Sequence, residues 1–273
     1  MDRSKKTNLI GELYKNRELI WKLARNDFKK RYAGSYLGAV WAMIQPVVTI
    51  VMYYIVFDVI MGAGAQSGPR ATSIPYVLFL TTGLVPWFFF SEAFTHGTAA
   101  MVEYNYLVKK VVFNVSILPV IKVLAAIFIH IFFVCVMLAM GCIYHYYPSV
   151  YTVQIIYYSF CTFVLTLGLC YITSAVMVFF RDIAQIIGIL LQIGMWATPI
   201  LWNIETLSPA WKLVISINPL VYIVNGYRNS VCYGVWFFED IWGTIYFWCF
   251  TIVIFVLGTT LFNRLKPHFA DVL

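Results

Sequence analysis

Charged residues are scarce in this chain. Asp, Glu, Lys and Arg make up 11% of the 273 residues, whereas a soluble domain has about a quarter. Apolar residues make up 62%, and the mean hydropathy is +0.80. So little charge cannot cover a chain of this size with a water-compatible surface, and the composition therefore excludes an ordinary soluble enzyme.

The sequence also lacks the motifs of nucleotide, metal and covalent chemistry. The dipeptide Gly-Lys does not occur, which excludes a phosphate-binding loop of the GxxxxGK[ST] type. The six cysteines include no CxxC pair, and His96, His130, His145 and His268 form no HExxH motif. We therefore expect no metal, no cofactor and no catalytic residue in this chain, and an energy source outside it.

Long stretches without Asp, Glu, Lys or Arg fill most of the chain. The longest contains 58 residues between Lys122 and Arg181, which is too long for one membrane helix of about 20 residues. The polar, turn-forming residues 146–149 divide it into two spans. Four further stretches of 21 to 26 residues supply one span each, so we predict an all-α polytopic membrane protein with six transmembrane helices. The predicted spans are about 37–61, 76–98, 117–144, 153–180, 183–202 and 241–263.

The segment 203–240, between the last two spans, is strongly apolar. Its charge-free run from Leu213 to Tyr227 has 15 residues, which reach only about 22 Å as a helix and do not cross a bilayer core of about 30 Å. We therefore predict an outer re-entrant or interfacial pair of helices rather than a seventh span. Such backbone is tolerated at membrane depth where it is buried in protein or lines a cavity.

The N-terminal segment predicts an amphipathic helix along the membrane surface. At 100° per residue, Ile20, Ala24 and Phe28 share one face of a helix over 17–32, and basic residues such as Lys29 flank that face. We divide the chain into a cytoplasmic N-terminal segment with this interface helix (1–36), a six-helix transmembrane domain (37–264) and a short cytoplasmic C-terminal tail (265–273).

The basic residues predict the orientation, because Lys and Arg near span ends are retained on the cytoplasmic side. The first 31 residues hold ten of the 19 Lys and Arg. With both termini in the cytoplasm, 16 basic residues, Lys122 among them, lie inside, and only Arg70, Lys212 and Arg228 lie outside. This asymmetry and attraction to anionic lipids account for the net charge of +7, so we expect membrane lipids and no nucleic acid as partners.

Two acidic residues fall within or near the predicted spans. Glu92 is deep enough in the second span to need a partner or water, and Asp58, near the outer end of the first, is interpreted as an interfacial carboxylate. Proton-coupled transport would place several such residues at mid-membrane, and only these two qualify.

Aromatic residues number 50, or 18% of the chain, and many of them cannot be assigned to the two interfacial belts alone. Most are expected to pack in belts and in the core. Aromatic rings also contact the apolar faces of sugars, so a surplus predicts a path for a glycan. The candidates lie near the outer ends of the first two spans: Tyr53, Tyr54, Phe57, Trp87, Phe88 and Phe89.

Four blocks of sequence carry a resemblance to a known family. The first is Arg25–Gly38 (RNDFKKRYAGSYLG), followed by Trp41 and Pro46. The other three are Asn105–Phe113 with Ile117–Pro119, Phe179–Ile183 with Thr198–Ile200, and Asn218–Leu220 through Arg228. In this order they resemble the membrane subunits of ATP-binding-cassette exporters of lipid-linked polysaccharides, namely O-antigen, capsule and teichoic acid.

The resemblance implies a role for each block. The interface helix would border a lateral opening for the lipid, where clustered cations would bind its (pyro)phosphate by charge-assisted hydrogen bonds. These cations are Arg25, Lys29, Lys30 and Arg31. The residues implied in coupling to the ATPase are Glu103, Asn105, Leu107, Lys109, Lys110, Phe113, Arg181 and Asp182. Those implied in an outer gate are Asn218, Pro219, Tyr222 and Arg228.

The resemblance also implies partners and a location. The chain would form a homodimer with two copies of a separate ATPase subunit, which would bind ATP and Mg²⁺. The dimer would move an undecaprenyl-linked glycan outward through a channel between its protomers, across the cytoplasmic (inner) membrane of a bacterium. The chain itself would be a transport subunit and not an enzyme.

Two alternatives stay open at this stage. An exporter of drugs or other small amphiphiles would share the architecture but would need no hydrophilic channel. A polyprenyl-phosphate glycosyltransferase would need a catalytic carboxylate at the cytoplasmic interface, where Asp27, Glu103 and Asp182 are the only nearby choices, and each of these is also explained by helix capping or ion pairing.

Overall fold

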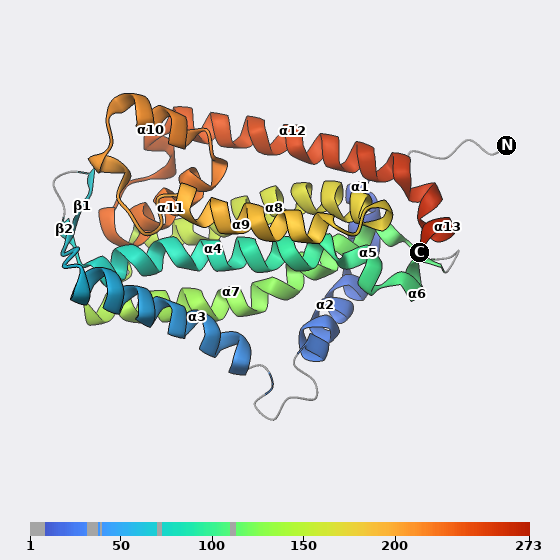
Figure 1. Cartoon of the computed structure of the whole chain (residues 1–273), viewed down its shortest axis with the longest axis horizontal. Helices are drawn as coiled ribbons and strands as arrows, with labels where there is room; N and C mark the ends of the chain where they lie inside the picture. Colours follow the sequence, from blue (N-terminus) through green and yellow to red (C-terminus); the bar gives the residue numbers. More distant parts are fainter. Residues whose placement is uncertain (1–8, 32–37, 39, 70–72, 110–112) are drawn as a thin grey trace.

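Figure 1 shows the fold of the computed structural model, which describes residues 9–31, 38, 40–69, 73–109 and 113–273. Long helices lie side by side along one axis as a bundle, and short elements gather at both ends (Figure 1). The strands β1 (Gln66–Ser67) and β2 (Ser73–Ile74) pair antiparallel at one end. The helices are α1 (Leu9–Lys15), α2 (Arg17–Arg31), α3 (Val40–Tyr53), the π-helix η1 (Tyr54–Ile60), α4 (Tyr76–Thr98), α5 (Ala100–Glu103), α6 (Asn105–Val108), η3 (Val115–Ile117), α7 (Leu118–Ile143), η4 (Val150–Val153), α8 (Gln154–Phe179), α9 (Ile183–Ala197), η5 (Ile204–Thr206), α10 (Pro209–Ser216), α11 (Pro219–Arg228), the π-helix η6 (Asn229–Tyr233), η7 (Phe237–Glu239), α12 (Ile241–Leu265), η8 (Lys266–His268) and α13 (Phe269–Val272).

Five helical stretches in the described part of the chain are long and apolar enough to cross a membrane. They correspond to predicted spans one, two, three, four and six, and the prediction of a polytopic all-α membrane protein is thereby confirmed. The stretches are Val40–Ile60, Tyr76–Thr98, Val115–Ile143, Val150–Phe179 and Ile241–Val272.

The predicted fifth span coincides with the apolar helix α9, which is shorter than the five membrane-spanning candidates. This helix has 15 residues and is about 22 Å long. It ends at Ala197 because Thr198 adopts an extended conformation before Pro199. Only Ile187 of α9 is buried within the protomer, so most of this helix presents its apolar side chains outward.

The core of the bundle is built around α4. This helix is apolar on all sides and most of its side chains are buried, as expected for a helix enclosed by others. It packs against α7, α8, α9 and α11. The hydroxyls of Thr81 and Thr82 donate to the carbonyl oxygens of Val77 and Leu78 at 2.7 and 2.9 Å, so these buried polar groups are satisfied within the helix.

The first span, α3 with η1, is only loosely attached to this core. In its most apolar stretch 6% of the residues are buried, compared with 83% for α4. Its exposed side chains are mostly aliphatic, such as Val48, Val51 and Ile55. Lipid or a second protomer is therefore needed to cover this face.

The segment between α9 and α12 forms the short helices α10 and α11 at one end of the bundle, beside β1 and β2 (Figure 1). The apolar run breaks at Asn218, whose side chain accepts the N–H of Leu220 at 3.0 Å, and Pro219 begins α11. Two helices are thus present where the re-entrant or interfacial pair is predicted. The helices α5 and α6 and the C-terminus lie at the opposite end (Figure 1).

Candidate functional site

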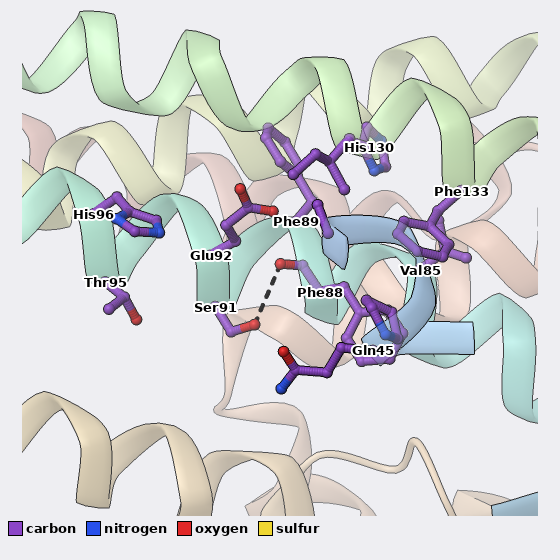
Figure 2. Close-up of a pocket in the computed structure, with 13 residues that line it drawn as sticks. Gln45, Val85, Phe88, Phe89, Ser91, Glu92, Thr95, His96, His130 and Phe133 are labelled. Atoms are coloured by element: carbon purple, nitrogen blue, oxygen red, sulfur yellow. Dashed lines mark hydrogen bonds between the residues drawn. The ribbon is translucent and has the colours of Figure 1, made fainter. Parts of the chain in front are cut away.

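A cavity of about 330 Å³ lies between α3, α4 and α7. Figure 2 shows that its wall is mixed, with Glu92, His96 and Gln45 among its polar side chains and phenylalanine rings beside them. Within a bundle of apolar helices, such a polar lining favours a hydrophilic ligand or water. The lining residues are Ala42, Gln45, Pro46, Val85, Phe88, Phe89, Ser91, Glu92, Thr95, His96, Ile129, His130 and Phe133.

His130 on α7 is fixed in the wall of this cavity by three neighbours. Its ring stacks on Phe89, with 4.5 Å between the centroids and 19° between the planes. Its Nε2 lies 2.9 Å from the hydroxyl oxygens of both Ser159 and Tyr227. Its buried Nδ1 has no hydrogen-bond partner among the described residues, so one ring nitrogen is left to bind a polar group.

Glu92 connects the cavity to the interface helix α2. One carboxylate oxygen accepts a hydrogen bond from Arg31 Nη1 at 3.1 Å. Arg31 also binds Asp27 one turn earlier, with Nη2 and Nε at 2.8 and 2.9 Å from Asp27 Oδ2. The prediction that Glu92 needs a partner is confirmed, and the partner is a residue of α2.

Asp27 is the centre of a buried ionic network at the α5–α6 end of the bundle. Its Oδ1 accepts hydrogen bonds from Lys122 Nζ at 2.5 Å and from the hydroxyl of Tyr104 at 2.7 Å. Lys122 also binds Glu103 and lies over the Tyr104 ring, 4.8 Å from its centroid. Lys122, which the sequence places among the flanking cytoplasmic cations, is instead only 2% exposed. The network joins α2, α5 and α7.

The electrostatics of Asp27 follow from these contacts. Burial alone would raise the pKa of this carboxyl, but the hydrogen bond from Lys122, the charges of Arg31 and Lys122, and the hydrogen bond from Tyr104 outweigh it and lower the pKa below its ordinary value. Burial and the hydrogen bond to Asp27 raise the pKa of Tyr104, so its hydroxyl stays a neutral donor. Asp27 is thus an ionised structural anion.

The four predicted phosphate-binding cations differ in their surroundings. Arg25, Lys29 and Lys30 are exposed on α2. Arg31, at the last position of α2, turns inward to Asp27 and Glu92 and has 11% of its side chain exposed. Three of the four cations therefore present free charge, and the fourth is engaged in ion pairs.

The predicted glycan-channel aromatics separate into two groups. Tyr53, Tyr54 and Phe57 are half-buried on α3 and η1, and the Tyr53 hydroxyl lies 3.9 Å from the sulfur of Met195 on α9. The other three candidates, Trp87, Phe88 and Phe89 on α4, pack closer to the core. Of these, Phe88 and Phe89 line the cavity, whereas Trp87 is 5% exposed and its ring packs at a tilt of 47° beside Phe90.

The predicted ATPase-coupling segment folds as two one-turn helices, α5 and α6. Asn105 and Lys109 are exposed, whereas Leu107 and Phe113 are half-buried and pack against the core. Lys110 lies outside the described residues. This segment therefore offers polar groups outward while its apolar side chains hold it to the bundle.

The remaining predicted coupling residues flank this segment. Glu103 is the last residue of α5, and 46% of its side chain is exposed although it binds Lys122. Arg181 and Asp182 are exposed in the turn between α8 and α9, at the same end of the bundle as α5 and α6 (Figure 1).

The four predicted outer-gate residues lie at the α10–α11 end. Asn218 caps α11 and donates to the Thr198 hydroxyl at 2.9 Å, which ties α11 to the end of α9. Pro219 opens α11, and the Tyr222 hydroxyl bonds to hydroxyl groups on α8 and α12. Arg228 closes α11 and is 2% exposed.

Sequence reasoning missed Lys122, Tyr104 and His130 as parts of these sites. One signal was present for Lys122, because the apolar residues Ile117–Ile121 precede it and place it inside the span rather than at its border. No local pattern pairs Lys122 with Asp27, since the two lie 95 residues apart. In the described part of the chain no three His, Cys, Asp or Glu side chains gather as a metal site would require.

Comparison with known proteins gives a match over most of the chain. A sequence profile described as ABC-2 type transporter matches residues 18–232. The chain is also 30% identical over 222 residues to the O-antigen export system permease protein RfbA of Myxococcus xanthus, covering 81% of this chain and 82% of that protein.

Two further relatives have related names. A protein of Klebsiella pneumoniae, also named O-antigen export system permease protein RfbA, is 28% identical over 270 residues, which are 97% of each chain. The polysialic acid transport protein KpsM of Escherichia coli is 21% identical over 241 residues, covering 87% of this chain and 89% of that protein.

Proposed function

The chain belongs to the ABC-2 type transporter family, and from this premise we propose that it is the membrane permease subunit of an ATP-driven polysaccharide exporter. The observation that carries the proposal is the match to an O-antigen export permease over 97% of both chains. The polar cavity among apolar helices supports a hydrophilic cargo over a small amphiphile. The cargo proposed is an undecaprenyl-linked glycan.

The proposed topology has six spans and two cytoplasmic termini in a bacterial inner membrane. Here α9 is the fifth span, and α10 and α11 form the re-entrant pair on the outside. The distribution of Lys and Arg supports this orientation. The loosely attached α3 and the outward apolar side chains of α9 support a homodimer whose protomers meet along these helices.

The proposed substrate opening lies beside α2. The exposed cations Arg25, Lys29 and Lys30 would bind the lipid phosphate, since charge-assisted hydrogen bonds favour phosphate oxygens. Arg31 would set the position of α2 by its ion pairs with Asp27 and Glu92. The glycan would then pass the aromatic side chains of α3 and α4 on its way between the protomers.

The proposed coupling runs from a separate ATPase subunit through α5 and α6. The partner would bind ATP and Mg²⁺ and would contact the exposed polar groups of this segment and of the α8–α9 turn. Glu103 and Tyr104 at the end of α5 bind Lys122 and Asp27, so a displacement of the segment would reach α2 directly. No catalytic residue is proposed in this chain, and the burial of Asp27 among cations supports a structural role for it.

The test uses the permease purified with its native partner in mild detergent and then in lipid nanodiscs. ATP hydrolysis is measured with and without undecaprenyl-pyrophosphate-linked glycan. We expect a stoichiometric ATPase partner and a turnover that responds to the glycan. A purified chain without ATPase partner, or hydrolysis that ignores the glycan at every concentration, would contradict the proposal.

A pair of charge-matched variants tests the phosphate-binding surface. Lys29→Gln with Lys30→Gln should raise the glycolipid concentration for half-maximal stimulation by about 30-fold, because each of the two cations near an anionic group contributes about 1 kcal/mol. Lys15→Gln with Arg17→Gln removes the same charge at the junction of α1 and α2, about three helical turns before Lys29, and should leave this concentration unchanged. Equal effects of the two double variants would show that the positive charge of this region attracts anionic lipid in general and that Lys29 and Lys30 form no specific phosphate-binding surface.

A further inference from the structure

Arg228 at the end of α11 is a buried cation without a carboxylate. It is 2% exposed, and its guanidinium carbon lies 3.6 Å from the centroid of the Phe79 ring. One nitrogen, Nη2, donates to the carbonyl oxygen of Ile200 at 3.1 Å. Among the described residues no Asp or Glu pairs with it, and its buried Nε has no acceptor. A guanidinium in this state lacks the partner that buried charges ordinarily have.

The side chain of Arg228 lines a cavity of about 140 Å³ at the α10–α11 end. One water needs only about 10–15 Å³ of such space, so the cavity has room for a larger ligand. Asn225 and Asn229 line it from the same turn of chain and are half-buried, and within the described structure neither side-chain amide makes a hydrogen bond. Three neighbouring residues therefore hold unused hydrogen-bonding groups at one cavity.

A second cavity, of about 90 Å³, lies on the other side of three residues that also line the first. Asn225, Asn229 and Asp240 line both cavities. The second cavity has an aromatic wall that includes Tyr158, Tyr222, Trp236 and Phe237. The two cavities together thus have Arg228 and Glu205 on the side of the first, the two amides and Asp240 along their shared border, and the aromatic rings on the side of the second.

This combination fits the chemistry of one ligand class. A saccharide ring carries hydroxyl groups around its edge, which amides, carboxylates and guanidinium groups bind in pairs. Its C–H faces are apolar and pack on aromatic rings. A lipid chain would leave the polar groups unsatisfied, and a lone inorganic anion would not use the aromatic wall.

We propose that the joined cavities around Arg228, Asn225 and Asn229 are a binding subsite for a saccharide ring at the outer end of the permease. Arg228 Nε donates to an oxygen atom of a substituent on the ring, either a hydroxyl or a carboxylate. The Asn amides bind the neighbouring hydroxyls. The assignment of this ring to the exported glycan rests on the proposed function, whereas the binding of a saccharide does not.

The experiment measures saturation transfer by NMR from the purified complex in nanodiscs to methyl glycosides. The neutral arm contains the methyl glycosides of glucose, galactose, mannose and N-acetylglucosamine, and the acidic arm contains methyl glucuronide. We expect transfer to ring protons in at least one arm. Transfer to the glucuronide alone identifies a carboxylate as the partner of Arg228, and transfer to neutral glycosides identifies hydroxyls.

The variants Asn225→Leu and Asn229→Leu should each weaken this binding about tenfold, since each removes hydrogen bonds to the ring. Arg228→Lys keeps the charge but loses the planar fork and should weaken it as well. The control is Gln66→Leu, which removes another side-chain amide at the same end that lines neither cavity. Thermal melting of each complex identifies a variant that fails to fold, and the Asn variants then decide the question.

Several outcomes overturn the subsite. These are the absence of transfer to every glycoside in the unmodified complex, and transfer that is equal in the unmodified complex and in the folded Asn variants. Glycolipid-stimulated ATP hydrolysis without saccharide transfer overturns the subsite and leaves the export function intact. Saccharide transfer in a chain that purifies without an ATPase partner contradicts the export function and leaves the subsite intact.

Discussion

The two ends of the molecule each bury one basic side chain, and they treat it differently. Lys122 and Arg228 are both 2% exposed. Lys122 binds the carboxylates of Asp27 and Glu103, whereas Arg228 has a carbonyl oxygen and the face of an aromatic ring. The charge of Lys122 is therefore neutralised within the chain, and Arg228 is left with unused hydrogen-bonding capacity.

This difference indicates that the end with Lys122 is held in one arrangement and that the end with Arg228 is suited to bind a ligand. A buried pair that satisfies its own charges holds helices in one arrangement, and breaking it is costly. A buried cation without a counter-ion gains most when a ligand brings the missing oxygen atoms. Four predictions test this comparison, beginning with the largest effect.

The largest effect is expected for Lys122→Met. It leaves Asp27 buried without its closest cation and should lower the free energy of unfolding by about 3–5 kcal/mol. The measurement is thermal melting and denaturant unfolding of the purified complex in detergent. The double variant Asp27→Asn with Lys122→Met removes both charges and should recover part of the loss. A single variant as stable as the unmodified protein would show that the inner network is not structural.

The second prediction concerns the pH dependence of Asp27. Its pKa in the folded protein is lower than the ordinary value of 3.8, so its ion pairs contribute fully above that value and are lost as pH falls through the folded pKa. The melting temperature of the unmodified protein should therefore fall more steeply than that of Asp27→Asn when the pH is lowered below about 5. Parallel curves for the two proteins would contradict the assignment.

The third prediction concerns Arg228 at the α10–α11 end of the bundle. Arg228→Met loses one hydrogen bond and the contact with the Phe79 ring, but it also removes a buried charge that has no counter-ion. These contributions oppose each other, so the free energy of unfolding should stay within about 1 kcal/mol of the unmodified value. Melting under the conditions used for Lys122→Met gives the comparison directly. A loss as large as that of Lys122→Met would mean that Arg228 is as structural as Lys122.

The sequence predicted the positions of the membrane spans better than it predicted the partners of the charged residues. Apolar runs indicate whole helices, so five of the six predicted spans and the short pair of helices after α9 were located from composition and length. Lys122 was counted among the cytoplasmic cations because Lys and Arg near span ends are retained on that side. Its burial depends on Asp27, 95 residues away. The helical period of α2 does place Arg31 on the same face as Ile20 and Ala24, but it does not identify Glu92 as its partner, since the two lie 61 residues apart.

The smallest effect is expected for Lys212→Met. Lys212 Nζ lies 2.6 Å from Glu205 Oε2, and 34% and 49% of the two side chains are exposed. Water screens such a pair, and holding two flexible side chains together costs entropy, so the free energy of unfolding should change by about 0.5 kcal/mol at most. Melting at low and high salt checks this, because the small difference should vanish when ions screen the pair. A large, salt-independent loss would break the comparison, since it would place a structural ion pair at the end where Arg228 has none.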